Sequence, residues 1–278
     1  MSRIIDTEPL VIESTYREQD AYSLIDKIYR RTVLSCGKCD KGFLRENINP
    51  QTETDFLYFK NKKCKCYHAY ETLRSYAVAG IPQEFWGMKD IDLQIDEKSK
   101  KNIGLYVQRL ELASDKGIGI LFLGSQQGIN NPNSGAGKTS SAIHVLQHAL
   151  AIGKPIYYTT MHSYFAKVYR TIEGDEDHYC HNLIDEIENV DFLCIDEVGK
   201  IKKTEYVYRR FEDMLRQRFS HLLVTLLITN MNEKELAEYV GPSLMDILRN
   251  NLLKISLIGD SYRAKRFQNL KQSIKMEV

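Results

Sequence analysis

No stretch of this sequence approaches the roughly 18 consecutive apolar residues that a helix needs to span a bilayer. An apolar secretion segment is also missing at the N-terminus, where Met1-Ser2-Arg3 leads into charged sequence. We therefore expect a soluble, cytoplasmic protein with no membrane partner.

An excess of charge of either sign is lacking as well. The 38 Lys and Arg residues nearly balance the 37 Asp and Glu residues. The field of the whole molecule therefore does not indicate a nucleic-acid-binding protein, and any such surface has to be local. Internal repeats and low-complexity tracts are absent too.

The length and apolar content favour one full-sized domain and a smaller one. A chain of 278 residues with 43% apolar content can bury a large core and still carry an appendage. Apolar residues recur at helical spacing from about residue 16 to 33, and residues 67–78 indicate a second helix. The break at Gly80-Ile81-Pro82 then predicts two domains, residues 1–80 and 81–278.

Four of the six cysteines are clustered, which favours a metal site over disulfides in a reducing compartment. Four thiolates are sufficient for a closed tetrahedral zinc site. His68, two residues beyond the tight Cys-x-Cys pair, is an alternative for one of the ligands. The predicted zinc ligands are Cys36, Cys39, Cys64 and Cys66.

Beyond residue 101, helical segments alternate with short apolar runs bounded by Gly, Pro or Asn, as buried parallel strands usually are. This alternation predicts an α/β fold with a parallel sheet covered by helices on both faces. The predicted strands are residues 118–123, 156–160, 192–195, 223–229 and 253–257. The predicted helices between them are residues 140–151, 164–172, 183–187 and 206–219.

A phosphate-binding loop follows the first predicted strand and precedes a helix, which is the context that gives this motif its meaning. Glycines in such a loop let backbone N–H groups turn toward phosphate oxygens, and the helix adds its positive N-terminal end. The usual leading glycine of the motif falls at Pro132. We predict that Lys138 contacts the β- and γ-phosphates of ATP and that Thr139 binds Mg²⁺. The predicted nucleotide-binding residues are Ser134, Gly135, Ala136, Gly137, Lys138, Thr139 and Ser140.

Two adjacent acids end the apolar run of residues 192–195. We predict that Asp196 holds Mg²⁺ through water and that Glu197 polarises the attacking water as a general base. A later strand ends in Thr229-Asn230, where the Asn230 amide could orient the same water.

Taken together, these motifs resemble the replicative-helicase loaders of the DnaC/DnaI type, AAA+ P-loop ATPases whose near relatives are the IstB transposition ATPases. The resemblance covers most of the chain. It includes the cysteine segment, Ile81-Pro82, the phosphate loop, the acid pair, Thr229-Asn230 and a closing Gly259-Asp260-Ser261-Tyr262-Arg263.

The resemblance implies roles for further residues. Asn230 would be a first sensor, Arg263 would be a second sensor at the γ-phosphate, and Arg249 would be the arginine finger that reaches a neighbouring subunit. Arg216 and Arg218 are alternatives for the finger. A finger supplied by a neighbour implies a homo-oligomeric ring or spiral.

The resemblance also implies a function, which is ATP-dependent loading of a replicative DNA helicase onto single-stranded DNA. The N-terminal domain would hold the helicase, and the basic and aromatic helix at residues 164–170 is a candidate DNA contact. An IstB-like ATPase acting with a transposase is the alternative. A third possibility, a non-catalytic adaptor gated by nucleotide, is disfavoured by the presence of both Asp196 and Glu197.

Overall fold

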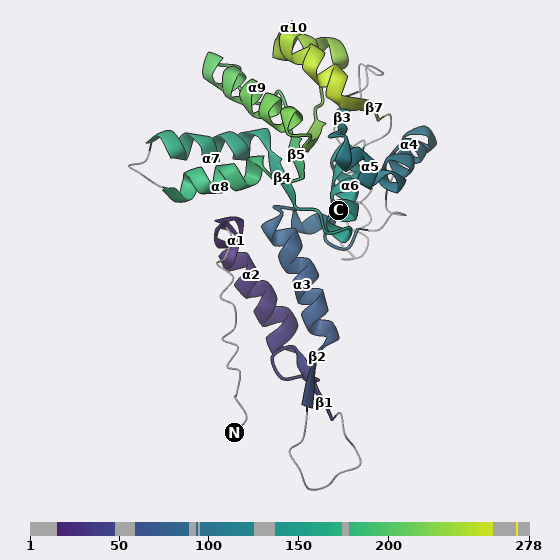
Figure 1. The fold of residues 1–278 in the computed structure, drawn as a ribbon, viewed down its shortest axis with the longest axis vertical. Coiled ribbons are helices and arrows are strands. Elements are labelled where there is room, and N and C mark those ends of the chain that lie inside the picture. Colours follow the sequence, from purple (N-terminus) through teal and green to yellow (C-terminus); the bar gives the residue numbers. More distant parts are fainter. Residues whose placement is uncertain are drawn as a thin grey trace, which may run out of the picture. The chain divides into compact units, whose positions relative to one another are not determined.

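The computed structural model describes residues 16–47, 59–88, 93, 95–124, 137–173, 178–257 and 271. Figure 1 shows the helices and strands of this structure. The chain separates into two compact units, residues 1–74 and residues 75–278. The predicted assignment of separate roles to residues 1–80 and 81–278 stays a prediction.

Unit 2 is built on a five-stranded sheet in the order β4-β5-β6-β3-β7, and every paired strand is parallel. Its strands are β3 (Gly119–Leu123), β4 (Ile156–Thr160), β5 (Phe192–Asp196), β6 (Val224–Ile228) and β7 (Leu252–Ser256). All residues of β3, β5 and β6 are buried, as expected for parallel strands covered on both faces.

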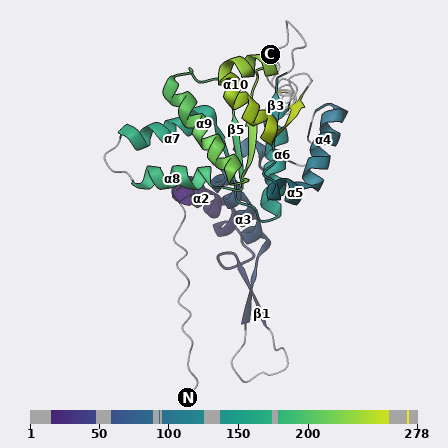
Figure 2. The ribbon, with the colours of Figure 1, turned by 45° about the horizontal axis from the view of Figure 1, so that its top comes forward.

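The connections between strands determine which face each helix covers. The chain runs from β3 across β6 and β5 to β4, and it then returns in the opposite direction through β5 and β6 to β7. Because crossovers between parallel strands are right-handed, the first connection and the later ones must lie on opposite faces. Accordingly, α6 (Lys138–Ala151) lies on one face, and α7 (Met161–Glu173), α9 (Glu205–Ser220) and α10 (Glu233–Asn251) lie on the other (Figures 1 and 2).

The remaining described helical segments of unit 2 are η2, a 3-10 turn (Gln83–Phe85), α4 (Glu97–Gln108), α5 (Leu110–Asp115) and α8 (His178–Glu188). Helix α4 packs against α6, and α8 packs against α7.

Side-chain caps fix where three of these helices begin. The Asp96 carboxylate accepts from the Ser99 N–H at α4, and the Thr204 hydroxyl accepts from the Val207 N–H at α9. Asn232 and Glu235 form a reciprocal capping box at α10. Each cap satisfies N–H groups that have no partner within the helix.

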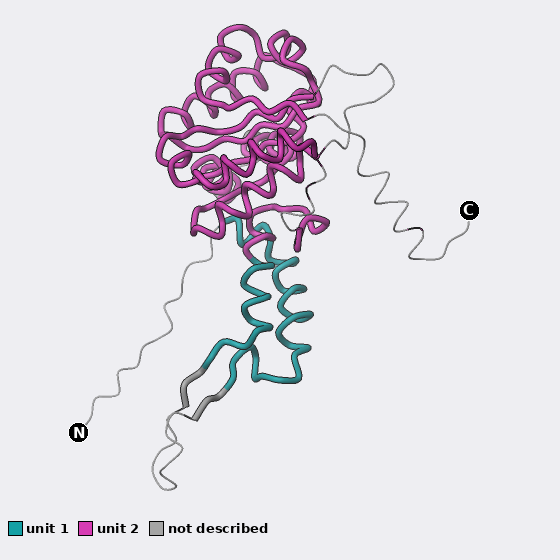
Figure 3. The backbone as a smooth tube through the Cα atoms, turned by 90° about the vertical axis from the view of Figure 1, so that its right-hand side faces the viewer, with its two compact units in different colours: residues 1–74 teal, residues 75–278 magenta. Residues whose placement is uncertain are grey.

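Unit 1 contains helical segments and one antiparallel hairpin (Figure 3). Its elements are α1 (Tyr16–Asp20), α2 (Tyr22–Tyr29), the π-helical turn η1 (Arg30–Leu34), β1 (Phe43–Asn47) and β2 (Phe59–Lys63). Helix α3 (Lys65–Val78) begins in unit 1, and its last residues belong to unit 2. The predicted helices at residues 16–33 and 67–78 are therefore present.

None of the helices in the described residues is long and apolar enough to cross a membrane.

Candidate nucleotide and metal sites

The N-terminus of α6 lies at the carboxyl end of β3, as the phosphate-loop prediction requires. Strand β3 ends at Leu123, and the next described residue after Gly124 is Gly137. Gly137 has a left-handed backbone (φ 88°) that favours glycine, and it precedes the first helical residue, Lys138. The predicted loop residues Ser134, Gly135 and Ala136 lie outside the described residues.

Helix α6 presents the three predicted nucleotide-binding residues in its first turn. The Lys138 side chain is largely buried, with 5% of its surface exposed. The Thr139 hydroxyl donates a hydrogen bond of 2.7 Å to Asp196 Oδ2. The Ser140 hydroxyl donates to the Gly137 carbonyl at 2.9 Å, so it closes the first turn of the helix. Thr139 therefore contacts the acid pair directly.

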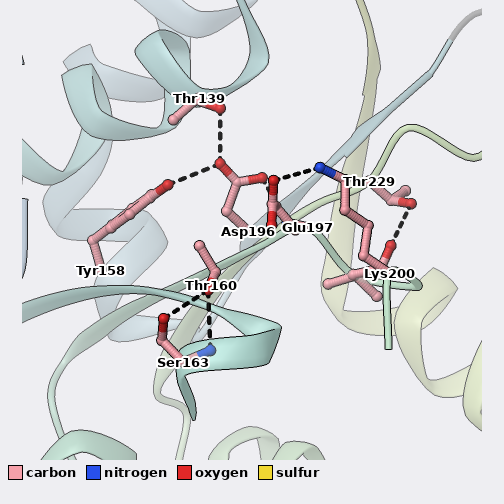
Figure 4. Close-up of polar contacts among 9 residues, drawn as sticks. Thr139, Tyr158, Thr160, Ser163, Asp196, Glu197, Lys200 and Thr229 are labelled. Carbon is pink, nitrogen blue, oxygen red and sulfur yellow. Dashed lines mark hydrogen bonds and ion pairs between the residues drawn. The ribbon is translucent and has the colours of Figure 1, made fainter. Parts of the chain in front are cut away.

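Asp196, the last residue of β5, accepts three hydrogen bonds although only 7% of its surface is exposed. Oδ2 accepts from the Thr139 hydroxyl and from the Tyr158 hydroxyl at 2.9 Å, and Oδ1 accepts from the Glu197 N–H at 2.6 Å (Figure 4). The two predicted halves of the site, the helix start and the acid pair, are therefore in direct contact.

Glu197 has a left-handed backbone, with φ at 62°. This conformation is uncommon for a residue with a Cβ, and it is often found at functional sites. The Lys200 N–H donates to the Glu197 carbonyl at 3.1 Å, and the two side chains form an ion pair. The Glu197 carboxylate is thus half-buried beside Asp196, at the start of a tight turn.

The end of β6 lies between the two halves of the site. The Thr229 N–H donates to the Phe122 carbonyl of β3 at 3.0 Å, and the Thr229 hydroxyl donates to the Val198 carbonyl after β5 at 2.8 Å. Asn230 follows directly and is exposed. The structure therefore places Asn230 at the same edge of the sheet as the acid pair.

Oxygen donors of this type suit magnesium. A threonine hydroxyl and a carboxylate are hard oxygen ligands, and Mg²⁺ usually binds one or two carboxylates together with waters and substrate phosphates. The contact between Thr139 and Asp196 brings two such groups within 2.7 Å of each other. The residues present therefore fit a magnesium ion bound to a nucleotide.

Tyr158 was missed by the sequence analysis. It lies on β4 and its ring is buried. Burial, and then the negative charge of Asp196, raise the pKa of Tyr158 above its ordinary value, so its hydroxyl stays a hydrogen-bond donor. The only sequence signal is a tyrosine in a predicted strand, and that signal does not reveal which strand lies beside β4.

The arginines considered for the finger differ in their surroundings. Arg218 is 1% exposed, and its guanidinium donates to the carbonyls of Glu188, Val190 and Val224 and to the Thr225 hydroxyl. It is therefore occupied within its own subunit.

Two other finger candidates have exposed side chains. Arg216 bonds to Glu212 and Ser243, and Arg249 on α10 forms an ion pair with Glu233 at 3.1 Å. Arg263 lies outside the described residues.

The four clustered cysteines form a second candidate site, in unit 1. Cys36 follows η1, Cys39 precedes β1, Cys64 follows β2, and Cys66 lies in the first turn of α3. Their sulfur atoms all lie within 4.8 Å of one another. A tetrahedral zinc ion at about 2.3 Å from each sulfur separates the sulfurs by about 3.8 Å, so the cluster fits zinc.

The surroundings of the thiols shift their pKa values in different directions. Burial raises the pKa of both Cys39 and Cys66, whereas a hydrogen bond from the Cys66 backbone lowers the pKa of Cys64. A divalent cation would reverse the cost of ionising such crowded thiols. His68, the alternative ligand, is exposed and lies 3.5 Å from Glu71, outside the cluster of four sulfurs.

Comparisons with known proteins point to helicase loaders. The replicative helicase loader DnaC of Escherichia coli is 27% identical over 132 residues, which cover 47% of this chain and 54% of DnaC. The crystal structure of the DnaC helicase loader superposes with a TM-score of 0.53 at 16% identity, covering 64% of this chain and all of that one. The resemblance to DnaC-type helicase loaders is confirmed. So is the AAA+ P-loop fold predicted from the sequence.

A second kind of relative is the putative ATP-binding protein of insertion sequence IS5376 from Geobacillus stearothermophilus. It is 28% identical over 165 residues, which cover 57% of this chain and 61% of that protein. No protein-family model matches the chain. The chain spans about half the length of the DnaC relatives that it matches.

Proposed function

We propose that this protein binds and hydrolyses Mg-ATP and uses this cycle to load a replicative DNA helicase onto single-stranded DNA. The observation that carries the nucleotide proposal is the 2.7 Å hydrogen bond between Thr139 and Asp196. It joins the start of the helix after the phosphate loop to the acid pair of a different strand, β5. A phosphate and metal site requires these two features in one place.

Five polar residues of the site have a task in this proposal. Lys138 neutralises the β- and γ-phosphates, and Thr139 and Asp196 hold magnesium. A magnesium ion held by these two residues would supply positive charge that stabilises the negative charge developing on the phosphates. Glu197 accepts the proton of the attacking water, and Asn230 orients that water.

Two substitutions separate ATP binding from hydrolysis. Lys138→Ala should abolish ATP binding, because a buried cation that faces the phosphates is removed. Glu197→Gln should leave binding intact and abolish hydrolysis, because an amide cannot accept the proton. Glu238→Gln, an exposed change on α10, is the matched control. Unchanged nucleotide affinity in Lys138→Ala would refute the site. Unchanged turnover in Glu197→Gln would favour a nucleotide-gated adaptor.

The loading function is supported by the DnaC relatives, which match this chain in sequence, and by the solved DnaC fold. The partners that we propose are a replicative helicase, held by the N-terminal unit, and single-stranded DNA, held by the AAA+ domain. The test is capture of the purified replicative helicase of the same organism by the full chain, with and without ATP. Failure to bind the helicase under either condition would contradict the loading function while leaving the ATPase proposal standing.

The IS5376 protein supports a second candidate, an ATPase that assists DNA transposition, because it matches a longer part of this chain than DnaC does. The same capture experiment with a purified insertion-sequence transposase decides between the two. Binding of the transposase and not of the helicase would favour transposition.

We also propose that the assembled protein is a homo-oligomeric ring or spiral, with Arg249 as the finger that acts on a neighbouring subunit. Its exposed position on α10 is compatible with that role. Light scattering with ATP and magnesium should show a species larger than a monomer. Arg249→Ala should lower hydrolysis without lowering the ATP affinity of the isolated subunit.

The cysteine cluster is the proposed zinc site. The ion would be held by Cys36, Cys39, Cys64 and Cys66. Closed sites with four thiolate ligands are typically structural, so we assign this ion to the folding of unit 1 and not to catalysis.

A further inference from the structure

The carboxylate of Asp196 is held by one residue that the proposed mechanism does not use, Tyr158. Its hydroxyl donates to Asp196 Oδ2 at 2.9 Å, and Thr139 donates to the same oxygen at 2.7 Å. The Glu197 N–H donates to the other oxygen at 2.6 Å. Oδ2 therefore accepts two hydrogen bonds and Oδ1 accepts one. Rotation of the carboxylate would break these buried hydrogen bonds, and each broken bond costs free energy.

The register of the sheet explains why a tyrosine at this position reaches the carboxylate. Tyr158 pairs with Cys194, so Asp196 lies two residues further along the neighbouring strand, on the same face. Such a diagonal neighbour is about 7–8 Å away, which aromatic side chains can span. A serine or threonine at position 158 is too short to reach, and a phenylalanine has no donor.

The main chain of Tyr158 is fixed from both sides. On one side it pairs with β5, and on the other side its N–H donates to the Ala79 carbonyl at 2.8 Å. Gly80 permits this approach, since a Cβ at Gly80 would lie 2.5 Å from the Tyr158 carbonyl oxygen. The ring packs in the core between the sheet and α6. The hydroxyl therefore has a fixed position relative to β5.

We propose that Tyr158 is a positioning residue for the magnesium site, which orients the Asp196 carboxylate toward the hydrated ion. This inference rests on the proposed binding of Mg-ATP. Magnesium demands near-ideal octahedral geometry, so the direction of a carboxylate that meets its waters matters. Groups that orient a metal-binding carboxylate typically contribute about 10- to 100-fold in metal affinity.

The test compares Tyr158→Phe with Tyr106→Phe in the full-length chain. Tyr106 is also a buried tyrosine of the same core, and its hydroxyl donates to the Ile118 carbonyl at 2.6 Å. Each substitution removes one buried hydroxyl and keeps the ring. The measurement is the affinity for a fluorescent ATP analogue, titrated with MgCl₂ and repeated in EDTA.

We expect Tyr158→Phe to raise the half-saturating magnesium concentration by about 10-fold, the lower end of the range for orienting groups. Its affinity for the analogue in EDTA should not change, and Tyr106→Phe should behave like the wild type. In an Asp196→Ala background, Tyr158→Phe should have no further effect, because the two residues act through one hydrogen bond.

Three results would overturn the inference. The first is that Tyr158→Phe leaves the half-saturating magnesium concentration unchanged, and the second is that Tyr106→Phe raises it equally. The third is that Tyr158→Phe alone fails to fold, which would mean that the hydroxyl stabilises the sheet. If the wild-type chain instead binds no nucleotide with magnesium, or if Lys138→Ala binds as well as wild type, the proposed function itself fails.

Discussion

Removing the proposed zinc ion from the cysteine cluster should unfold unit 1 and leave the AAA+ core folded. The perturbation is chelation of the freshly purified protein, with Cys39→Ser as its genetic counterpart. Cys180→Ser is the matched control, because Cys180 lies on α8 in unit 2, outside the cluster.

The magnitude follows from how little apolar surface the described part of unit 1 buries. Among its described residues, only Ile28, Val33 and Cys64 are buried hydrophobic side chains. Full burial of an Ile or Val side chain contributes about 1.5–3 kcal/mol, so this pair contributes roughly 3–6 kcal/mol. Structural zinc contributes about 10–16 kcal/mol in small peptides. The proposed ion would therefore contribute more than these two side chains, so its loss should unfold the unit.

The assay combines elemental analysis with hydrogen exchange. We expect one zinc ion per chain, and chelation should remove amide protection from residues 16–47 and 59–74 while residues 97–123 keep theirs. Cys39→Ser should behave like the chelated protein, and Cys180→Ser should retain the ion. The reasoning is refuted if the fresh protein contains no zinc, or if unit 1 stays protected after the metal is gone.

Three further predictions concern stability. Arg218→Met leaves buried carbonyls without their donor, so we expect a loss of about 3–5 kcal/mol in urea unfolding, and a loss below about 1 kcal/mol would contradict this role. Gly119→Ala should prevent folding, because its Cβ would lie 1.9 Å from a carbonyl oxygen of β6. Its counterpart Gly104→Ala on α4, whose Cβ would have no atom within 4 Å, should raise stability by about 0.5–1 kcal/mol in the same assay. A hydrogen bond from Lys254 lowers the pKa of Glu233 below its ordinary 4.5, so this ion pair contributes stability above that pH and loses it as pH falls through the folded pKa. Thermal melts of Glu233→Gln should therefore show a weaker loss of stability with acid, and an unchanged acid profile would disprove the linkage.

The parallel sheet was predictable because its strands are short, largely apolar runs bounded by turn residues. The runs at residues 118–123, 156–160 and 192–195 match β3, β4 and β5 closely. The acid pair also stands out in the sequence, since Asp196 and Glu197 follow directly on the apolar run of residues 192–195. Local patterns in one sequence were therefore sufficient to predict the α/β class of the fold.

The order of the strands was not predictable in this way. Nothing local indicates that β6 lies between β3 and β5, because this order arises from where the crossovers return to the sheet. The contact of Tyr158 with Asp196 depends on that topology and was missed. Arg218 was missed as a core residue because charged side chains are rarely buried. Its buried position is explained by the backbone carbonyls that accept its hydrogen bonds.

The hairpin β1–β2 was also missed. Its strands carry charged residues such as Arg45, Lys60 and Lys63, so neither alternation nor an apolar run marks them. The cysteines on either side of this hairpin, two before β1 and two after β2, were recognised by their spacing alone.

The position of β6 has a consequence for how the nucleotide site responds to distant changes. Neighbouring strands lie about 4.8 Å apart, so the strand that precedes the phosphate loop and the strand that carries the acids are held roughly 10 Å apart by a third strand. Backbone hydrogen bonds set this spacing, whereas the side chains of β6 project toward the helices that cover the two faces, α6 and α9 among them. A search for variants with altered ATP affinity should therefore include the buried Leu226 and Leu227, because a change in their volume would shift a covering helix without touching the nucleotide.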